Sequence, residues 1–312
     1  MNTKNYSFHK PFAHTYSIVA RDESTGKMGV GVQSHWFSVG SVVPWGESGV
    51  GVVATQAFCN VSFGLRGLNL LKKGKTPQDA LELLLSSDDG KDVRQLAILD
   101  AEGRTAVHTG KNCIQAAGHK KGANYSVQAN MMLHDTVWPA MADAFEKNSE
   151  LALPERIIEV LKAAESQGGD IRGKQSAAIL IVGGEKKENR WEDPEIDLRV
   201  GDHQEPLKEL ERLLKVHRSY EHMNNGDLAL EKNDMETALK EYESSYTMMP
   251  DNLEMKFWTA VSLANVQKFD ECMPLFKEIF TKDRNWHLLT ERLPKVGLLK
   301  LTEDQFKQIL AL

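Results

Sequence analysis

Thr15 is the residue of this sequence best placed to act as a nucleophile. It opens the first strand-like run, residues 15–22, and the segment before it, residues 1–14, resembles neither a domain nor a targeting signal. If that segment were removed, Thr15 would carry both a nucleophilic hydroxyl and its own α-amine, which can act as the general base. A β-branched residue that merely begins a strand fits the same position, so both interpretations stay open.

A second group of polar residues lies in the glycine-rich segment 168–176. Asp170, Arg172, Gln175 and Ser176 can form a hydrogen-bonded cluster at the start of a strand, where a rigid sheet supports a binding loop. A self-satisfied turn with an Asp–Arg ion pair is an equally good interpretation. Ser176 lacks a Gly-x-Ser-x-Gly elbow, so we expect it to bind rather than to attack.

Composition excludes several classes of function. The chain has 312 residues, 41% of them hydrophobic and 26% charged, which is typical of a soluble globular protein with room for two domains. A net charge of -6 argues against nucleic-acid binding, because phosphate contacts need clustered Lys and Arg. No apolar run approaches the roughly 20 residues that span a bilayer, and the first residues lack the apolar region of a signal peptide.

The cysteine and histidine patterns argue against a metal site. Cys59, Cys113 and Cys272 lie far apart without a Cys-x-x-Cys pair, which also speaks against a disulfide framework and fits a reducing compartment. The histidines lie on different expected elements without ligand spacing. We therefore expect a cytoplasmic protein with neither a metal nor a cofactor.

The elements that must position these residues follow two regimes. Up to about residue 202, strand signals such as 28–34, 39–45 and 50–57 are interleaved with pairs of helices. This order differs from alternating βαβ units, so it predicts an α+β fold of stacked antiparallel sheets covered by helices. Asn60 is expected to cap the first helix.

From Tyr220 onward the sequence repeats at a constant spacing. The spacing and its small or apolar positions resemble tetratricopeptide repeats, whose unit is about 34 residues long, and generic helical hairpins are the alternative. We expect a helical domain over 218–312, after a domain over 15–217. The repeating pairs are Ala229 with Leu263, Met235 with Phe269, Ala238 with Cys272, Tyr242 with Phe276, and Tyr246 with Phe280.

Ordered segments between residue 15 and about residue 217 carry a resemblance to a known family. They are 15–22, 29–34, 40–45, 49–57, 64–68, 94–96, 168–177 and 197–203. Together they resemble the bacterial and archaeal domain-of-unknown-function family 1028, within the N-terminal-nucleophile hydrolase superfamily. The start is also similar to proteasome β-type subunits, although Gln33 stands where those carry an acid. The resemblance implies a four-layer αββα sandwich.

The resemblance also implies a site around Thr15. In that fold the first residue attacks an amide carbonyl, its amine transfers the proton, and nearby donors hold the oxyanion. Proteasome-type sites use an early lysine, but no lysine occurs between Lys27 and Lys72, and Arg66 is the expected source of positive charge. The expected binding residues are Gln33, Ser34, Gln56, Asn60, Arg66 and Asn130, with Asp170, Arg172, Gln175 and Ser176 from the later loop.

Two functions follow from these observations. The first is a hydrolase that cleaves a C–N amide bond of a small molecule or peptide after loss of a leader, residues 1–14. Its helical domain would bind a protein partner or support a homodimer. The second is a catalytically silent sandwich that acts as a binding module, because a fold alone does not fix a function.

Overall fold

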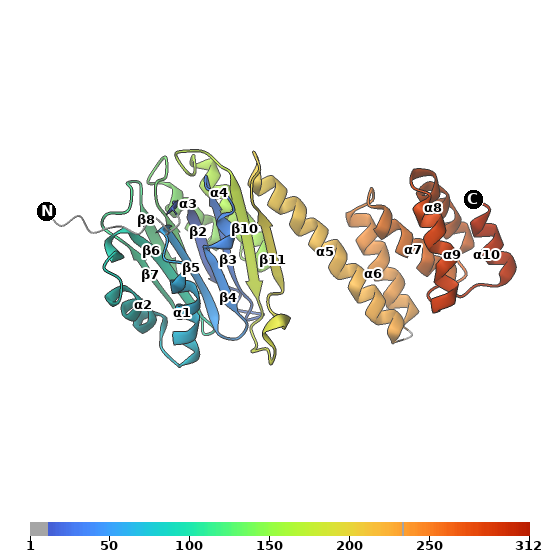
Figure 1. Ribbon diagram of the computed structural model, residues 1–312, viewed down its shortest axis with the longest axis horizontal. Helices are drawn as coiled ribbons and strands as arrows, with labels where there is room; N and C mark the ends of the chain where they lie inside the picture. Colours follow the sequence, from blue (N-terminus) through green and yellow to red (C-terminus); the bar gives the residue numbers. More distant parts are fainter. Residues whose placement is uncertain (1–11, 233) are drawn as a thin grey trace. The chain divides into compact units, whose positions relative to one another are not determined.

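Two antiparallel β-sheets build the first unit of the structure, a computed structural model that describes residues 12–232 and 234–312 (Figure 1). In spatial order, the first sheet is β1 (Phe12–Ala13), β5 (Gly51–Phe58), β6 (Arg94–Asp100) and β7 (Thr105–Thr109), with β4 (Pro44–Glu47) also paired to β5. The second sheet is β11 (Ile196–Val200), β10 (Ser176–Val182), β3 (Met28–Ser34), β2 (Tyr16–Arg21), β9 (Tyr125–Ala129) and β8 (Gly118–Gly122). Of the expected leader, residues 1–14, only 12–14 lie among the described residues.

Helices pack on both sheets, and the sheets contact each other. The first sheet carries α1 (Ser62–Lys72) and α2 (Pro77–Ser86), and the second carries α3 (Val137–Lys147) and α4 (Leu153–Ser166). Between the sheets, β2 contacts β5 and β6, while β4 contacts β3 and β10. The predicted α+β class with two antiparallel sheets is therefore confirmed.

The sequence of β3 explains how three of these layers pack closely. Val30 and Val32 are fully buried in the apolar cluster between the two sheets. The alternate residues are glycines, and a Cβ added to Gly31 would lie 2.2 Å from Cγ2 of Ile157 in α4. Because side chains alternate between the faces of a strand, valines fill one face while glycines let the helix approach the other.

Replacement of Gly31 by alanine tests this packing. The new methyl group must push α4 away from the sheet, so we expect Gly31→Ala to lower the free energy of unfolding by about 1–3 kcal/mol in urea denaturation. Gly201→Ala is the matched control, because its Cβ would meet nothing closer than 3.8 Å, and we expect a change within about 0.5 kcal/mol. Equal effects of the two substitutions would contradict this account.

Two expected elements differ from the structure. The strand expected over 39–45 is partly wrong, because Ser38 adopts a left-handed φ of 56° and 39–41 form a 3-10 turn before β4. Asn60 is not the cap of α1, since the cap position is Val61, which makes no side-chain cap hydrogen bond. Asn60 instead donates from Nδ2 to Asp88.

The C-terminal region is helical, as predicted. The two compact units of the chain separate between Arg212 and Leu213, inside α5 (Pro206–Glu231). The remaining helices are α6 (Met235–Met248), α7 (Leu253–Asn265), α8 (Phe269–Lys282), α9 (Asn285–Arg292) and α10 (Glu303–Leu310). None of the helices in the described residues has the length and apolar content needed to cross a membrane.

The constant spacing of the sequence pairs is visible in these helices. Helices α6 and α8 are of equal length, and both ends of α8 are offset from those of α6 by the spacing that separates Met235 from Phe269. The last residues of α5 and α7, Glu231 and Asn265, differ by the same offset, although their first residues do not. Tyr242 and Phe276, one of the repeating pairs, are both at most 1% exposed. The repeat in the sequence is thus a repeat of helices with matching buried positions.

Candidate functional site

The peptide bond between His14 and Thr15 lies where the chain passes from one sheet to the other. Residues 12–13 pair with β5 in the first sheet, whereas β2 pairs with β3 and β9 in the second. Both residues of the crossing are buried, with His14 1% and Thr15 0% exposed. The residues immediately before Thr15 are therefore built into the fold, and every polar atom of the crossing needs a partner within the protein.

Two donors hold the carbonyl oxygen of His14. Ser34 donates from Oγ at 2.5 Å, and Arg172 donates from Nη2 at 2.9 Å. The Arg172 guanidinium is fixed by Asp170, whose buried carboxylate accepts from Nη2 at 2.7 Å and from Nε at 3.0 Å. Two fixed donors at one carbonyl oxygen, one of them charged, are the arrangement that stabilises an oxyanion during acyl transfer.

Thr15 is held on both sides of its Cα atom. Its hydroxyl donates to the backbone carbonyl of Gln33 at 3.0 Å. Its own carbonyl oxygen accepts from the backbone N–H of Asn130 at 3.1 Å, and from the side-chain amides of Gln56 and Asn130 at 3.3 Å each. The Thr15 hydroxyl is thus held by β3, and the carbonyl groups on both sides of its Cα are fixed by hydrogen bonds.

A chain of buried side-chain amides runs between the sheets behind Thr15. Gln128 donates to the Ser17 hydroxyl, Ser17 donates to Gln56, and Gln56 donates to Gln95, each at 2.6 Å. Asn130 also donates to Gln95, at 2.8 Å. These five side chains are fully buried. Because a satisfied buried network admits few alternative arrangements, it fixes the backbone around Thr15.

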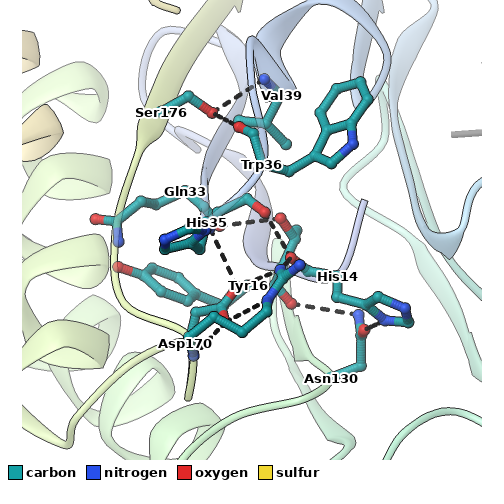
Figure 2. Close-up of polar contacts among 12 residues, drawn as sticks. His14, Tyr16, Gln33, His35, Trp36, Val39, Asn130, Asp170 and Ser176 are labelled. Atoms are coloured by element: carbon teal, nitrogen blue, oxygen red, sulfur yellow. Dashed lines mark hydrogen bonds and ion pairs between the residues drawn. The ribbon is translucent and has the colours of Figure 1, made fainter. Parts of the chain in front are cut away.

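The donor and acceptor directions within this network determine which side-chain atom of Asn130 faces His14. Gln95 donates from Nε2 to the backbone carbonyls of Gly118 and Ala129, at 3.2 and 2.9 Å, so its Oε1 must face Asn130. Asn130 then uses Nδ2 as a donor and turns Oδ1 toward Nδ1 of His14, at 2.7 Å (Figure 2). An amide oxygen only accepts, so His14 donates from Nδ1.

Burial disfavours the charged form of the His14 imidazole. Burial lowers its pKa below the ordinary value of 6.5, and the hydrogen bond to Asn130 opposes that shift only in part. A neutral ring with a proton on Nδ1 matches the acceptor that Asn130 offers.

A carboxylate reaches the other side of the site from α4. Glu165 accepts from the Tyr16 hydroxyl and from Nε2 of Gln33, both at 2.7 Å. Burial, together with the nearby Glu165, raises the pKa of Tyr16 well above its usual value, so the hydroxyl remains a donor. Gln33 thus places an amide against the Glu165 carboxylate, which comes from a part of the chain far along the sequence.

The sequence of this chain matches a family model over residues 15–210, so the match begins at Thr15. The model is described as "Family of unknown function (DUF1028)". The chain belongs to the DUF1028 family. It is similar to the crystal structure of protein SPO2555 from Silicibacter pomeroyi, also assigned to DUF1028, with 32% sequence identity and a TM-score of 0.58. The alignment covers 65% of this chain and 85% of that one, and no curated protein matches this chain.

Most of the site residues expected from the sequence converge in this DUF1028 structure. Ser176 lies at one side of the group, where it donates to the backbone carbonyl of Trp36 at 2.5 Å and accepts from the N–H of Val39 at 3.0 Å (Figure 2). It thereby anchors the loop that follows Ser34. The expected residues that converge around the His14–Thr15 bond are Gln33, Ser34, Gln56, Asn130, Asp170 and Arg172.

Three expected residues contact other groups instead. Arg66 is exposed on α1 and donates to Ser87, so the positive charge at the His14 carbonyl comes from Arg172. Gln175 donates to Asp202 at 3.1 Å. Asn60 donates to Asp88, which forms an ion pair with Arg94. Among the described residues, no group of three or more His, Cys, Asp or Glu is placed to hold a metal ion.

Sequence reasoning misses His14, Gln95, Gln128 and Glu165. Glutamines inside otherwise apolar strands are the available signal, since Gln95 precedes the run 96–99 and Gln128 follows Val127. A buried amide needs partners, so several such strands predict a shared polar network. Glu165 gives no local signal, because its two partners lie in β2 and β3, far earlier in the chain.

Gln95→Leu should destabilise the protein strongly. It leaves the amides of Gln56 and Asn130 without their shared acceptor, and each unpaired buried group costs about 1–3 kcal/mol, so we expect a loss of about 2–4 kcal/mol in urea denaturation. Gln78→Leu removes an exposed glutamine that bonds Glu82, and we expect a change within about 0.5 kcal/mol. A Gln95→Leu protein as stable as the control would show that the network does not support the fold.

The ion pair between Asp88 and Arg94, to which Asn60 also donates, predicts a pH dependence of stability. Burial alone would raise the pKa of Asp88, but hydrogen bonds from Arg94, Asn60 and the Gly90 N–H outweigh it and lower the pKa from 3.8 to about 2. A lowered pKa adds stability above pH 3.8 that is lost as the pH falls toward 2. We expect Asp88→Asn to be less stable than wild type at pH 6, with a difference that shrinks below pH 4. A difference that is constant from pH 6 to pH 2 would contradict this origin.

Proposed function

We propose that Thr15 cleaves its own peptide bond with His14 and then serves as the nucleophile of an N-terminal-nucleophile-type amide hydrolase. The observation that carries this proposal is the pair of donors, Ser34 and Arg172, on the carbonyl oxygen next to the Thr15 hydroxyl. Their convergence on the one peptide oxygen that precedes a buried threonine favours acyl transfer over a purely structural role.

The first reaction moves the acyl group from nitrogen to oxygen. The Thr15 hydroxyl oxygen attacks the carbonyl carbon of His14, and the developing oxyanion stays within the hydrogen bonds of Ser34 and Arg172. The C–N bond then breaks, the nitrogen takes up the proton that the hydroxyl loses, and an ester remains. Water hydrolyses this ester, so residues up to His14 leave with a carboxylate and Thr15 keeps a free hydroxyl and a free α-amine.

The same groups would act on an external amide. The new α-amine accepts the proton of the Thr15 hydroxyl as it attacks, and later transfers it to the leaving nitrogen. Arg172 is charged at every accessible pH, so its field disfavours protonation of the neighbouring amine. In this role Arg172 replaces the early lysine of proteasome-type sites.

The architecture agrees with this proposal. Helices on the outer faces of two stacked sheets, with Thr15 directly before β2, support an αββα sandwich. The regular repeat of helices in the second unit favours a tetratricopeptide-like unit, which would bind a protein partner or a second copy of the chain. The alternative, a silent binding module, is favoured by the complete burial of Thr15 while residues 12–14 remain in place.

The mass of the intact purified protein separates these possibilities. Wild type should convert to a chain that begins at Thr15, Thr15→Ala should stay at full length, and Thr15→Ser should still be cleaved. Ser34→Ala removes one oxyanion donor and should slow cleavage about 100-fold. Thr281→Ala, on the exposed face of α8, is the matched control and should be cleaved like wild type.

A wild-type chain that keeps its full length during prolonged incubation would reject self-cleavage. That result would favour the binding module.

A further inference from the structure

The residues before Thr15 occupy part of a strand edge that an extended peptide could use. β6 pairs along one edge of β5. On the other edge, β4 pairs with residues 51–54 and β1 pairs with Ala57 and Phe58. Departure of the leader would therefore expose the backbone of Ala57 and Phe58. An extended peptide can add to such an edge through main-chain hydrogen bonds, and side-chain pockets then select its sequence.

The side chain of His14 fills a pocket with defined chemistry. Its Nδ1 lies 2.7 Å from Oδ1 of Asn130, and its ring meets the ring of Phe58 edge-on, with centroids 5.4 Å apart at 90°. The amide network fixes Oδ1 of Asn130 as the group that faces the pocket. Among the described residues, the surroundings of the His14 side chain thus include a hydrogen-bond acceptor and an aromatic ring.

We propose that residues 13–14 occupy the acyl side of the site as a substrate does, and that the enzyme hydrolyses peptidyl amides with histidine directly before the cleaved bond. The inference rests on the proposed function of Thr15, because the carbonyl that Thr15 attacks belongs to the residue in this pocket. It adds to that function the chemical class of the substrate.

The pocket discriminates among side chains by what they offer to Asn130. An imidazole donates from Nδ1 and meets the Phe58 ring edge-on, whereas a phenyl or leucine side chain leaves Oδ1 of Asn130 buried without that donor. A carboxylate brings a second acceptor against Oδ1. The preceding position takes a small residue, since Ala13 is fully buried within the core between the sheets.

The test uses the cleaved protein that begins at Thr15, with both of its units. Only the substrate is varied, so the fold of the enzyme stays unchanged. Three coumarylamides are compared by kcat/KM: acetyl-Ala-His, its Nδ1-methylhistidine analogue, and acetyl-Ala-Leu. Methylation at Nδ1 removes the single proton that Asn130 accepts. We expect the unmodified histidine amide to react about 10-fold faster or more than either of the others.

Each outcome separates this inference from the proposed function. A chain that cleaves itself at Thr15 but hydrolyses the three amides at similar rates, or none of them, overturns the histidine subsite and leaves self-cleavage standing. A chain that neither cleaves itself nor hydrolyses any amide overturns both. A preference for histidine that methylation at Nδ1 does not reduce would overturn the role of Asn130 in recognition.

Discussion

The structure of the first unit depends on one constraint, the buried crossing of the chain from the first sheet to the second at His14 and Thr15. A peptide that leaves one sheet for another cannot use strand pairing for its own polar groups, and here it has no access to water. Side chains from β3, β5, Asn130 after β9 and the loop after α4 supply partners, together with the backbone N–H of Asn130. The crossing thus lies outside the strands, and hydrogen bonds from several other elements hold it.

This arrangement places polar groups where an apolar core would be simpler. Buried amides stabilise a fold only when all of them are satisfied, and the network from Gln128 to Asn130 is directional from end to end. Strained backbone lies beside it, since Ala57 and Met131 adopt left-handed φ angles of 66° and 61°. Residues in that region cost about 1–3 kcal/mol and concentrate at functional sites. The strain and the network together favour a site over an ordinary core.

The sequence predicts the strands better than it predicts the site. Met28–Ser34 and Ser176–Val182 follow from their β-branched, apolar patterns with the observed ends, because both lie inside a sheet and are buried on both faces. Ser34 lies at the end of a strand, as expected, whereas Thr15 lies directly before β2 rather than at its first residue. The roles of His14 and Glu165 do not follow from the sequence, because they come from partners that the register of separate elements brings close. Asn60 is the opposite case. Its side chain has the chemistry of a helix cap, but it donates a hydrogen bond to Asp88 instead of capping α1.

The central claim is that the His14–Thr15 bond is held for transfer to the Thr15 hydroxyl, and trapping of the ester tests it most directly. Hydroxylamine at neutral pH attacks esters much faster than peptide bonds, so the full-length chain is incubated with it and the fragments are weighed. We predict a fragment that ends at His14 as a hydroxamate in wild type, and its absence in Thr15→Ala. A wild-type chain that yields no such fragment, and stays intact beside the Thr15→Ala chain, would contradict the claim.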